Sequence, residues 1–148
     1  MVLSIPRLLL LSYSLVVVLS ILKASALSVA TASRRGALKR FINEEDATWL
    51  GGTHLEVDDP SVQRLFRAHR NELENLVLFV PAGALYLVSA ASALAGTIYC
   101  GAFLLGRSAH TYAYLSRKAS LRRNGYTIAW LTNIIMSIHA LVAMIVHT

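Results

Sequence analysis

Four long apolar segments constrain the fold of this 148-residue chain more than any other feature of its sequence. They lie at about residues 8–31, 72–95, 97–115 and 124–146, and each holds close to the ~20 residues that a helix needs to cross a bilayer core. Only 15% of the residues are charged, whereas a soluble domain has about 25%. We therefore predict an all-α membrane protein, a single domain over residues 1–148 in which four transmembrane helices form a bundle.

The basic residues indicate how the chain is oriented. Seven of the fourteen lysines and arginines lie in the polar segment at about 34–70, four lie in the loop at about 116–123, and Arg7 alone lies clearly on the other side. Because cytoplasmic loops carry the excess of Lys and Arg, both loops should face the cytosol and both termini the opposite side. The net charge of +6 follows from this bias and does not indicate a nucleic-acid partner.

The first apolar block admits a second interpretation. Arg7 could form the basic region of a signal peptide, the leucine-rich run after it the apolar region, and Ala24-Ser25-Ala26 the cleavage site. We favour a retained span, because the basic cluster at 34–40 follows the block and would hold that end in the cytosol.

Single residues predict several boundaries. Pro60, followed by polar residues, predicts the start of the helix that becomes the second span, and Pro81 can kink that span. The second and third spans should pair as a hairpin that turns at Gly96. The single cysteine, Cys100, rules out an intramolecular disulfide and any multi-cysteine metal site.

The first candidate set of polar residues lies where the second span begins. Arg67, Arg70, Asn71 and Glu74 follow one another at i, i+3, i+4 and i+7 and therefore share one helical face. Because these groups would be costly against lipid, they should face the bundle or a water-filled cleft. The alternative is a structural ion-pair network in which Glu74 pairs with Arg67 or Arg70.

The second set lies inside the third span, at the same helical spacing. Its members are Arg107, His110, Thr111 and Tyr114. An arginine within a span is a functional candidate by default, whereas His110 and Tyr114 could instead form hydrogen bonds between helices. A lone histidine in the last span, His139, is interpreted as a satisfied core or interfacial residue.

The third set, Arg122, Arg123 and Tyr126, lies at the cytosolic start of the last span. Basic residues are expected there from orientation alone, and Tyr126 could be an interfacial anchor. All three sets lie near the cytosolic ends of spans and should meet in one cleft, which would suit an anionic polar ligand. The sequence contains no phosphate-binding loop and no metal-ligand motif, so phosphate cofactors and metals are unsupported.

Three separated motifs carry a resemblance to a known family. They are Arg64-x-x-Arg67-Ala-His69-Arg70-Asn71-x-x-Glu74-Asn75, the upstream Phe41-x-Asn43-x-Glu45-Asp46-Ala47 and the downstream Gly106-Arg107-x-x-His110-Thr-x-Ala-Tyr114-Leu. On these motifs the chain resembles the MAPEG superfamily, the membrane-associated proteins of eicosanoid and glutathione metabolism. The resemblance covers nearly the whole chain and is strongest to the branch of microsomal glutathione transferases and microsomal prostaglandin E synthases.

The resemblance implies a homotrimer of four-helix protomers in the endoplasmic reticulum membrane, with lumenal termini. Glutathione would bind near the cytosolic face between adjacent protomers, without a metal. The implied glutathione contacts are Arg35, Arg67, His69, Arg70, Asn71, Glu74, His110, Tyr114, Arg122 and Tyr126. Arg122 would stabilise the glutathione thiolate, or Arg123 if the register shifts by one residue.

The activity implied is that of a glutathione transferase, which conjugates glutathione to hydrophobic electrophiles, with an extension to glutathione peroxidase activity on lipid hydroperoxides. One alternative is the isomerisation of prostaglandin H2 to prostaglandin E2. Arg123 weakens that alternative, because prostaglandin E synthases carry a serine directly after the corresponding arginine. A second alternative is a catalytically silent membrane scaffold that keeps the fold.

Overall fold

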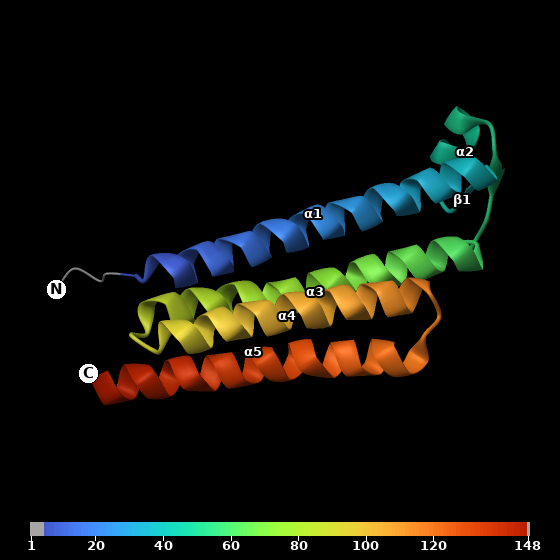
Figure 1. The fold of residues 1–148 in the computed structure, drawn as a ribbon. Coiled ribbons are helices and arrows are strands. Elements are labelled where there is room, and N and C mark those ends of the chain that lie inside the picture. Colours follow the sequence, from blue (N-terminus) through green and yellow to red (C-terminus); the bar gives the residue numbers. More distant parts are fainter. Residues whose placement is uncertain (1–4, 148) are drawn as a thin grey trace.

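The computed structural model describes residues 5–147, in which four long helices run side by side (Figure 1). They are α1 (Arg7–Leu38), α3 (Pro60–Val88), α4 (Ala93–Leu115) and α5 (Ala119–His147). Consecutive long helices run in opposite directions, so the two ends of the chain lie at one end of the molecule (Figure 1). The α1–α3 and α4–α5 connections lie together at the other end (Figure 1), and most of the basic residues lie in these connections or in the adjoining parts of the helices. The predicted all-α class is confirmed.

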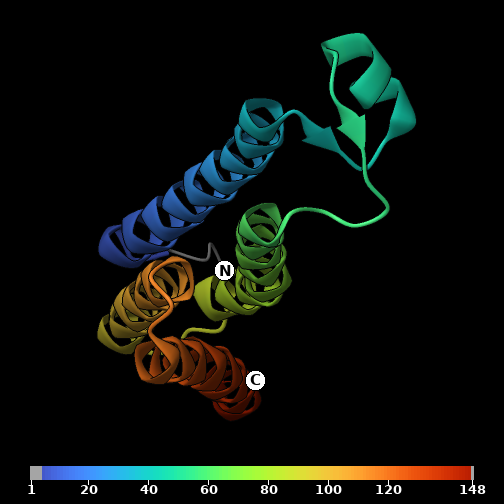
Figure 2. The same ribbon diagram turned by 90° about the vertical axis from the view of Figure 1, so that its right-hand side faces the viewer.

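The connection between α1 and α3 holds three short elements. These are β1 (Arg40–Phe41), α2 (Glu44–Leu50) and β2 (Thr53–His54), and the two strands pair in parallel. Figure 2 shows that this connection projects sideways from the end of α1, away from the long helices. The strand pair is absent from the sequence-based prediction, because two-residue strands leave no alternating pattern to detect.

Two helices, α1 and α5, shorten the predicted cytosolic loops. α1 continues through the start of the predicted 34–70 loop, and α5 begins before residue 124, so the predicted 116–123 loop is reduced to residues 116–118. Hydropathy marks where apolar residues end, but arginine and lysine are good helix formers and carry both helices further. Arg122 and Arg123 therefore lie within the first turns of α5.

The predicted turn at Gly96 is wrong, because α3 ends at Val88 and α4 begins at Ala93. Ser92 caps α4 by accepting a hydrogen bond from the Ala95 backbone N–H at 3.4 Å. Gly96 is buried within α4, where a Cβ would lie 2.5 Å from Cε1 of Tyr86. This glycine permits close helix packing, a role that sequence alone does not separate from that of a turn residue.

The predicted start of the second long helix is confirmed at Pro60. The Asp59 carboxylate caps α3 by accepting hydrogen bonds from the Ser61 hydroxyl at 2.7 Å and the Ser61 backbone N–H at 2.9 Å. These hydrogen bonds stabilise the charged carboxylate and hold the pKa of Asp59 below its usual range. The cap fixes where α3 begins and therefore where its arginines lie.

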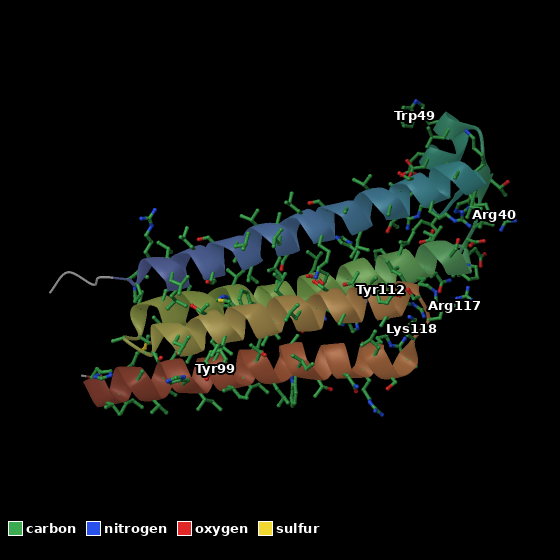
Figure 3. All side chains as sticks on the ribbon, in the orientation of Figure 1. Arg40, Trp49, Tyr99, Tyr112, Arg117 and Lys118 are labelled. Atoms are coloured by element: carbon green, nitrogen blue, oxygen red, sulfur yellow. The ribbon has the colours of Figure 1, made fainter. Side chains whose placement is uncertain are left out.

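Aromatic side chains form the centre of the packing between helices. The rings of Phe79 and Phe103 stack with centroids 4.0 Å apart, which joins α3 to α4. Towards the end that holds the termini, His139 Nδ1 lies 3.3 Å from the Tyr86 hydroxyl and 3.2 Å from the Tyr99 hydroxyl. Figure 3 labels Tyr99 at that end, remote from Arg117 and Lys118 at the α4–α5 connection. The prediction that His139 is a satisfied histidine is confirmed, and its ring is partly buried among these hydroxyl partners.

Two of the described helices, α1 and α5, are long and apolar enough to cross a membrane by themselves. α3 begins with a run of polar residues that includes three arginines, and α4 carries Arg107 within its length. Pro81 lies inside α3, which continues beyond it to Val88.

At Gly125 the backbones of α5 and α4 come into close contact, so we expect replacement of this glycine by alanine to destabilise the protein. A Cβ there would lie 2.7 Å from the backbone O of Gly106 and 2.7 Å from the backbone N of His110. Because backbone cannot move aside cheaply, the helices must separate, at a cost of roughly 1–3 kcal/mol. Denaturant unfolding in detergent measures this change.

Gly101 provides the matched control, since a Cβ there meets nothing within 4 Å. Gly101→Ala should be neutral or stabilising by up to about 1 kcal/mol, because alanine is the better helix former. Equal destabilisation by both substitutions would contradict the packing account.

Candidate functional site

A polar pocket lies at the end of the molecule that holds the α1–α3 and α4–α5 connections. It has a volume of about 240 Å³. Its lining comes from the start of α3, the end of α4 and the start of α5, namely Pro60, Gln63, Arg64, Arg67, Tyr114 and Arg122. Three guanidinium groups therefore line one small cavity, which suits an anionic ligand.

Tyr114 organises this pocket from the end of α4. Its backbone O accepts a hydrogen bond from Arg64 Nη1 at 3.2 Å, which ties α3 to α4. The guanidinium carbon of Arg122 lies 5.1 Å from the centroid of the Tyr114 ring, which places the cation against the π face. Arg67 is held on its own helix by a 2.9 Å hydrogen bond from Nη2 to Gln63 Oε1.

His110 lies beside the pocket and connects it to Tyr126. Its ring centroid is 5.8 Å from that of Tyr114 and 6.3 Å from that of Tyr126. His110 is 4% exposed, and its Nδ1 is buried with no hydrogen-bond partner among the described residues. The predicted residues Arg67, His110, Tyr114, Arg122 and Tyr126 are thus brought together at one end of α4 and its neighbours.

The polar stripe of α3 was expected to face the bundle or a water-filled cleft, and within the protomer Arg70 and Glu74 do not face the other helices. Their side chains are 72% and 53% exposed in the single chain and pair with each other, with Arg70 Nε 2.9 Å from Glu74 Oε1. This is the structural ion pair that the spacing also allowed. The stripe is wider than the contact between α3 and α4, so its outer edge stays on the surface of the protomer.

Arg35 and His69 also lie outside the polar pocket. Arg35 forms a two-pronged ion pair with Asp58, with Nε 2.8 Å from Oδ1 and Nη2 2.6 Å from Oδ2. His69 lines a groove of about 400 Å³ between α1 and α3. The described protomer by itself therefore does not gather all the predicted contacts into one cleft.

A buried ionic network lies behind the pocket and determines the position of Asn71. The fully buried Glu72 carboxylate accepts hydrogen bonds from Arg107 at 3.0 and 3.3 Å, and Lys23 Nζ lies 3.2 Å from its other oxygen. Arg107 Nη1 also donates to Asn71 Oδ1 at 3.0 Å. The Arg107 guanidinium is therefore paired with Glu72 and Asn71, and this pairing fixes the Asn71 side chain, which belongs to the same polar stripe as Arg70 and Glu74.

Lys23 and Glu72 are residues that the sequence reasoning did not single out. Both are charged side chains within or at the edge of apolar segments, and a charge in such a place usually faces the protein interior with a partner. That signal could have paired them with Arg107. Gln63 in the polar pocket had no comparable signal, because polar residues are ordinary at the start of a helix.

Comparison with known proteins decides the family. Residues 13–142 match the MAPEG family. This chain belongs to the MAPEG family. The family consists of all-α membrane proteins, so the chain is a membrane protein.

Two kinds of MAPEG proteins are similar to this chain. Prostaglandin E synthase of Equus caballus is 37% identical over 114 residues, which cover 76% of this chain and 74% of that protein. The Homo sapiens prostaglandin E synthase is 36% identical over the same length. Microsomal glutathione S-transferase 1 of Bos taurus is 37% identical over 99 residues, covering 64% of this chain and 63% of that protein.

Proposed function

We propose that this MAPEG protein is a glutathione transferase that conjugates glutathione to hydrophobic electrophiles. The observation that carries the proposal is the polar pocket, which Arg64, Arg67 and Arg122 line together with Tyr114. Glutathione has two carboxylates, which guanidinium groups bind with charge-assisted hydrogen bonds. A relative named glutathione S-transferase, 37% identical to this chain, supports the same ligand.

The chemistry requires glutathione to react as its thiolate. A free thiol has a pKa of about 8.5 and is mostly protonated at neutral pH, but a nearby guanidinium lowers that pKa. Arg122 would supply this charge, with Arg123 as the alternative if the register is shifted by one. The sulfur then forms a bond to the electrophilic carbon, a leaving group such as chloride departs from an aryl substrate, and the thiol proton is released to water.

We propose further that the complete site forms between protomers of a homotrimer. Arg70 and Glu74 lie exposed on the outer face of α3, and His69 lines a separate groove, so a neighbouring protomer is needed to bring their side chains to the same ligand as Arg122. Exposed charge on a membrane protein is costly unless it is covered or faces water. In this assembly the four long helices cross the endoplasmic reticulum membrane, with the site on the cytosolic face and the termini in the lumen.

Prostaglandin E synthesis is a second candidate. The observation in its favour is that relatives with this name match 76% of the chain, compared with 64% for the glutathione transferase. The family resemblance argues against it, since it implies that Arg123 stands where prostaglandin E synthases carry a serine. Incubation with prostaglandin H2 and glutathione, with prostaglandin E2 as the product measured, distinguishes the two.

Ultraviolet difference spectroscopy of the purified protein in detergent tests the proposal directly. Addition of glutathione should produce the absorbance of a bound thiolate at about 240 nm at neutral pH. Addition of chlorodinitrobenzene should then yield the conjugate. Folded protein that shows neither signal would contradict the proposal and leave a silent scaffold as the better account. Peroxidase activity is tested separately, with a lipid hydroperoxide as the substrate.

Arg70→Ala should mainly weaken glutathione binding. Loss of one charge-assisted contact to a carboxylate is expected to raise the dissociation constant about tenfold or more, with a smaller effect on kcat. Arg40→Ala is the control, because Arg40 is 53% exposed, pairs with Asp59 in the connection and lies outside the predicted contacts. Unchanged affinity in Arg70→Ala would remove Arg70 from the site.

A further inference from the structure

A second, mostly apolar groove lies between α3 and α5, deeper along the helices than the polar pocket. It has a volume of about 320 Å³. Its lining residues are Leu78, Trp130, Asn133, Ile134, Ser137 and Ile138. Neither the contacts predicted from the sequence nor the proposed glutathione site includes any of them.

Asn133 is the unusual member of this lining. It is 6% exposed, and both its amide nitrogen and its amide oxygen are buried without a hydrogen-bond partner among the described residues. An unpaired buried amide is costly, because it has lost its hydrogen bonds to water and gained none in return. Rotation about the side-chain amide torsion, which is broad for asparagine, can turn either group into the groove.

The groove continues the proposed site along one face of α5. Arg122, Tyr126, Trp130, Asn133 and Ser137 are separated by four, four, three and four residues, so they form a single stripe. At a helical rise of about 1.5 Å per residue, Asn133 lies about 16 Å beyond Arg122 along the axis. A long ligand could therefore have one end at the cationic pocket and an interior atom at Asn133.

We propose that this groove holds the chain of a lipophilic ligand that carries a hydroxyl group partway along it. Such a group can donate a hydrogen bond to the amide oxygen of Asn133 and accept one from its amide nitrogen, so it satisfies both atoms at once. A plain acyl chain would leave both unpaired. The anionic or reactive end of the same ligand would lie at Arg122 and Tyr126, and this placement of the ligand rests on the proposed function.

Fluorescence of Trp130 can report occupancy of the groove without any turnover. The chain has two tryptophans, and Trp49 is 82% exposed on α2, so Trp49→Phe leaves Trp130 as the single tryptophan, which can be excited selectively at about 295 nm. Titration of this variant in detergent compares 12-hydroxyoctadecanoate with octadecanoate, which share a carboxylate and a chain. We expect the hydroxylated acid to bind about fivefold to tenfold more tightly, as one net hydrogen bond predicts.

Substitutions at Asn133 test whether its amide is responsible. In the Trp49→Phe background, Asn133→Leu and Asn133→Ala should both abolish the preference for the hydroxylated acid. Thr132→Val is the matched control, since the Thr132 hydroxyl already donates to the Ile128 backbone O at 2.7 Å and should not affect the preference.

Three outcomes would overturn the inference. The first is equal binding of the two acids to the Trp49→Phe protein. The second is a preference for the hydroxylated acid that survives both Asn133 substitutions. The third is a change in the oligomer mass of Asn133→Leu, measured by light scattering, which would make the groove a contact between protomers. The thiolate spectrum of the same protein reports separately on the proposed function.

Discussion

Replacing Arg122 with glutamine should lower kcat for chlorodinitrobenzene conjugation by about tenfold to a hundredfold, with a smaller loss of glutathione affinity. Arg122 lies against Tyr114 in the polar pocket, and its charge is the one assigned to the sulfur. Loss of a group that stabilises developing or resident negative charge acts mainly on the chemical step. Glutamine keeps the length and polarity of the side chain but removes its charge.

The activity of the Arg122→Gln variant should depend on pH in a defined direction. Without the guanidinium, the pKa of the bound thiol should rise towards the free value of about 8.5, so the thiolate fraction at neutral pH should fall and raising the pH should restore part of the activity. Absorbance at about 240 nm as a function of pH measures the shift.

Arg117→Gln is the control for net charge, because Arg117 lies in the α4–α5 connection (Figure 3) and does not line the pocket. Similar losses of kcat in the two variants would indicate a general effect of charge. If Arg123→Gln alone produced the loss, the register would be shifted by one residue.

Replacing Glu72 with leucine should destabilise the protein by about 3–5 kcal/mol, because it leaves Arg107 and Lys23 as buried cations without their counter-ion. Glu72 and Arg107 are both fully buried, and the three charges join α1, α3 and α4. Chemical unfolding in detergent measures the loss.

Glu74→Gln is the matched control, two residues further along α3. Glu74 is 53% exposed and pairs only with the exposed Arg70 in the described part of the chain, so its loss should cost less than about 0.5 kcal/mol. If Glu72→Leu were as mild as Glu74→Gln, the ionic network would not contribute to stability. Combining Glu72→Leu with Lys23→Leu should recover part of the loss, because one of the two unpaired cations is then removed.

The same network should also affect the site. Arg107 donates both to Glu72 and to Asn71, so the buried ion pair holds the Asn71 amide in one orientation at the edge of the α3 stripe. Stability and glutathione binding are therefore expected to be coupled through Arg107.

The sequence by itself determined the class of the protein and most of its helices. Three of its signals are local: apolar segments of span length, the bias of basic residues and the proline that begins α3. Each reflects a property of one segment that does not depend on which other segments it packs against. The same local character explains why the three polar sets were found, since residues at helical spacing share a face in any helix.

Only the tertiary structure decided which of those residues meet. Gly96 fits a turn by sequence but is a packing residue, because its role depends on Tyr86 of the preceding helix. Arg107 and Arg70 looked alike as polar-stripe arginines, yet Arg107 is buried against Glu72 while Arg70 lies on the surface. Partner choice between helices depends on their rotation and distance, and the spacing of residues along one helix does not contain that information.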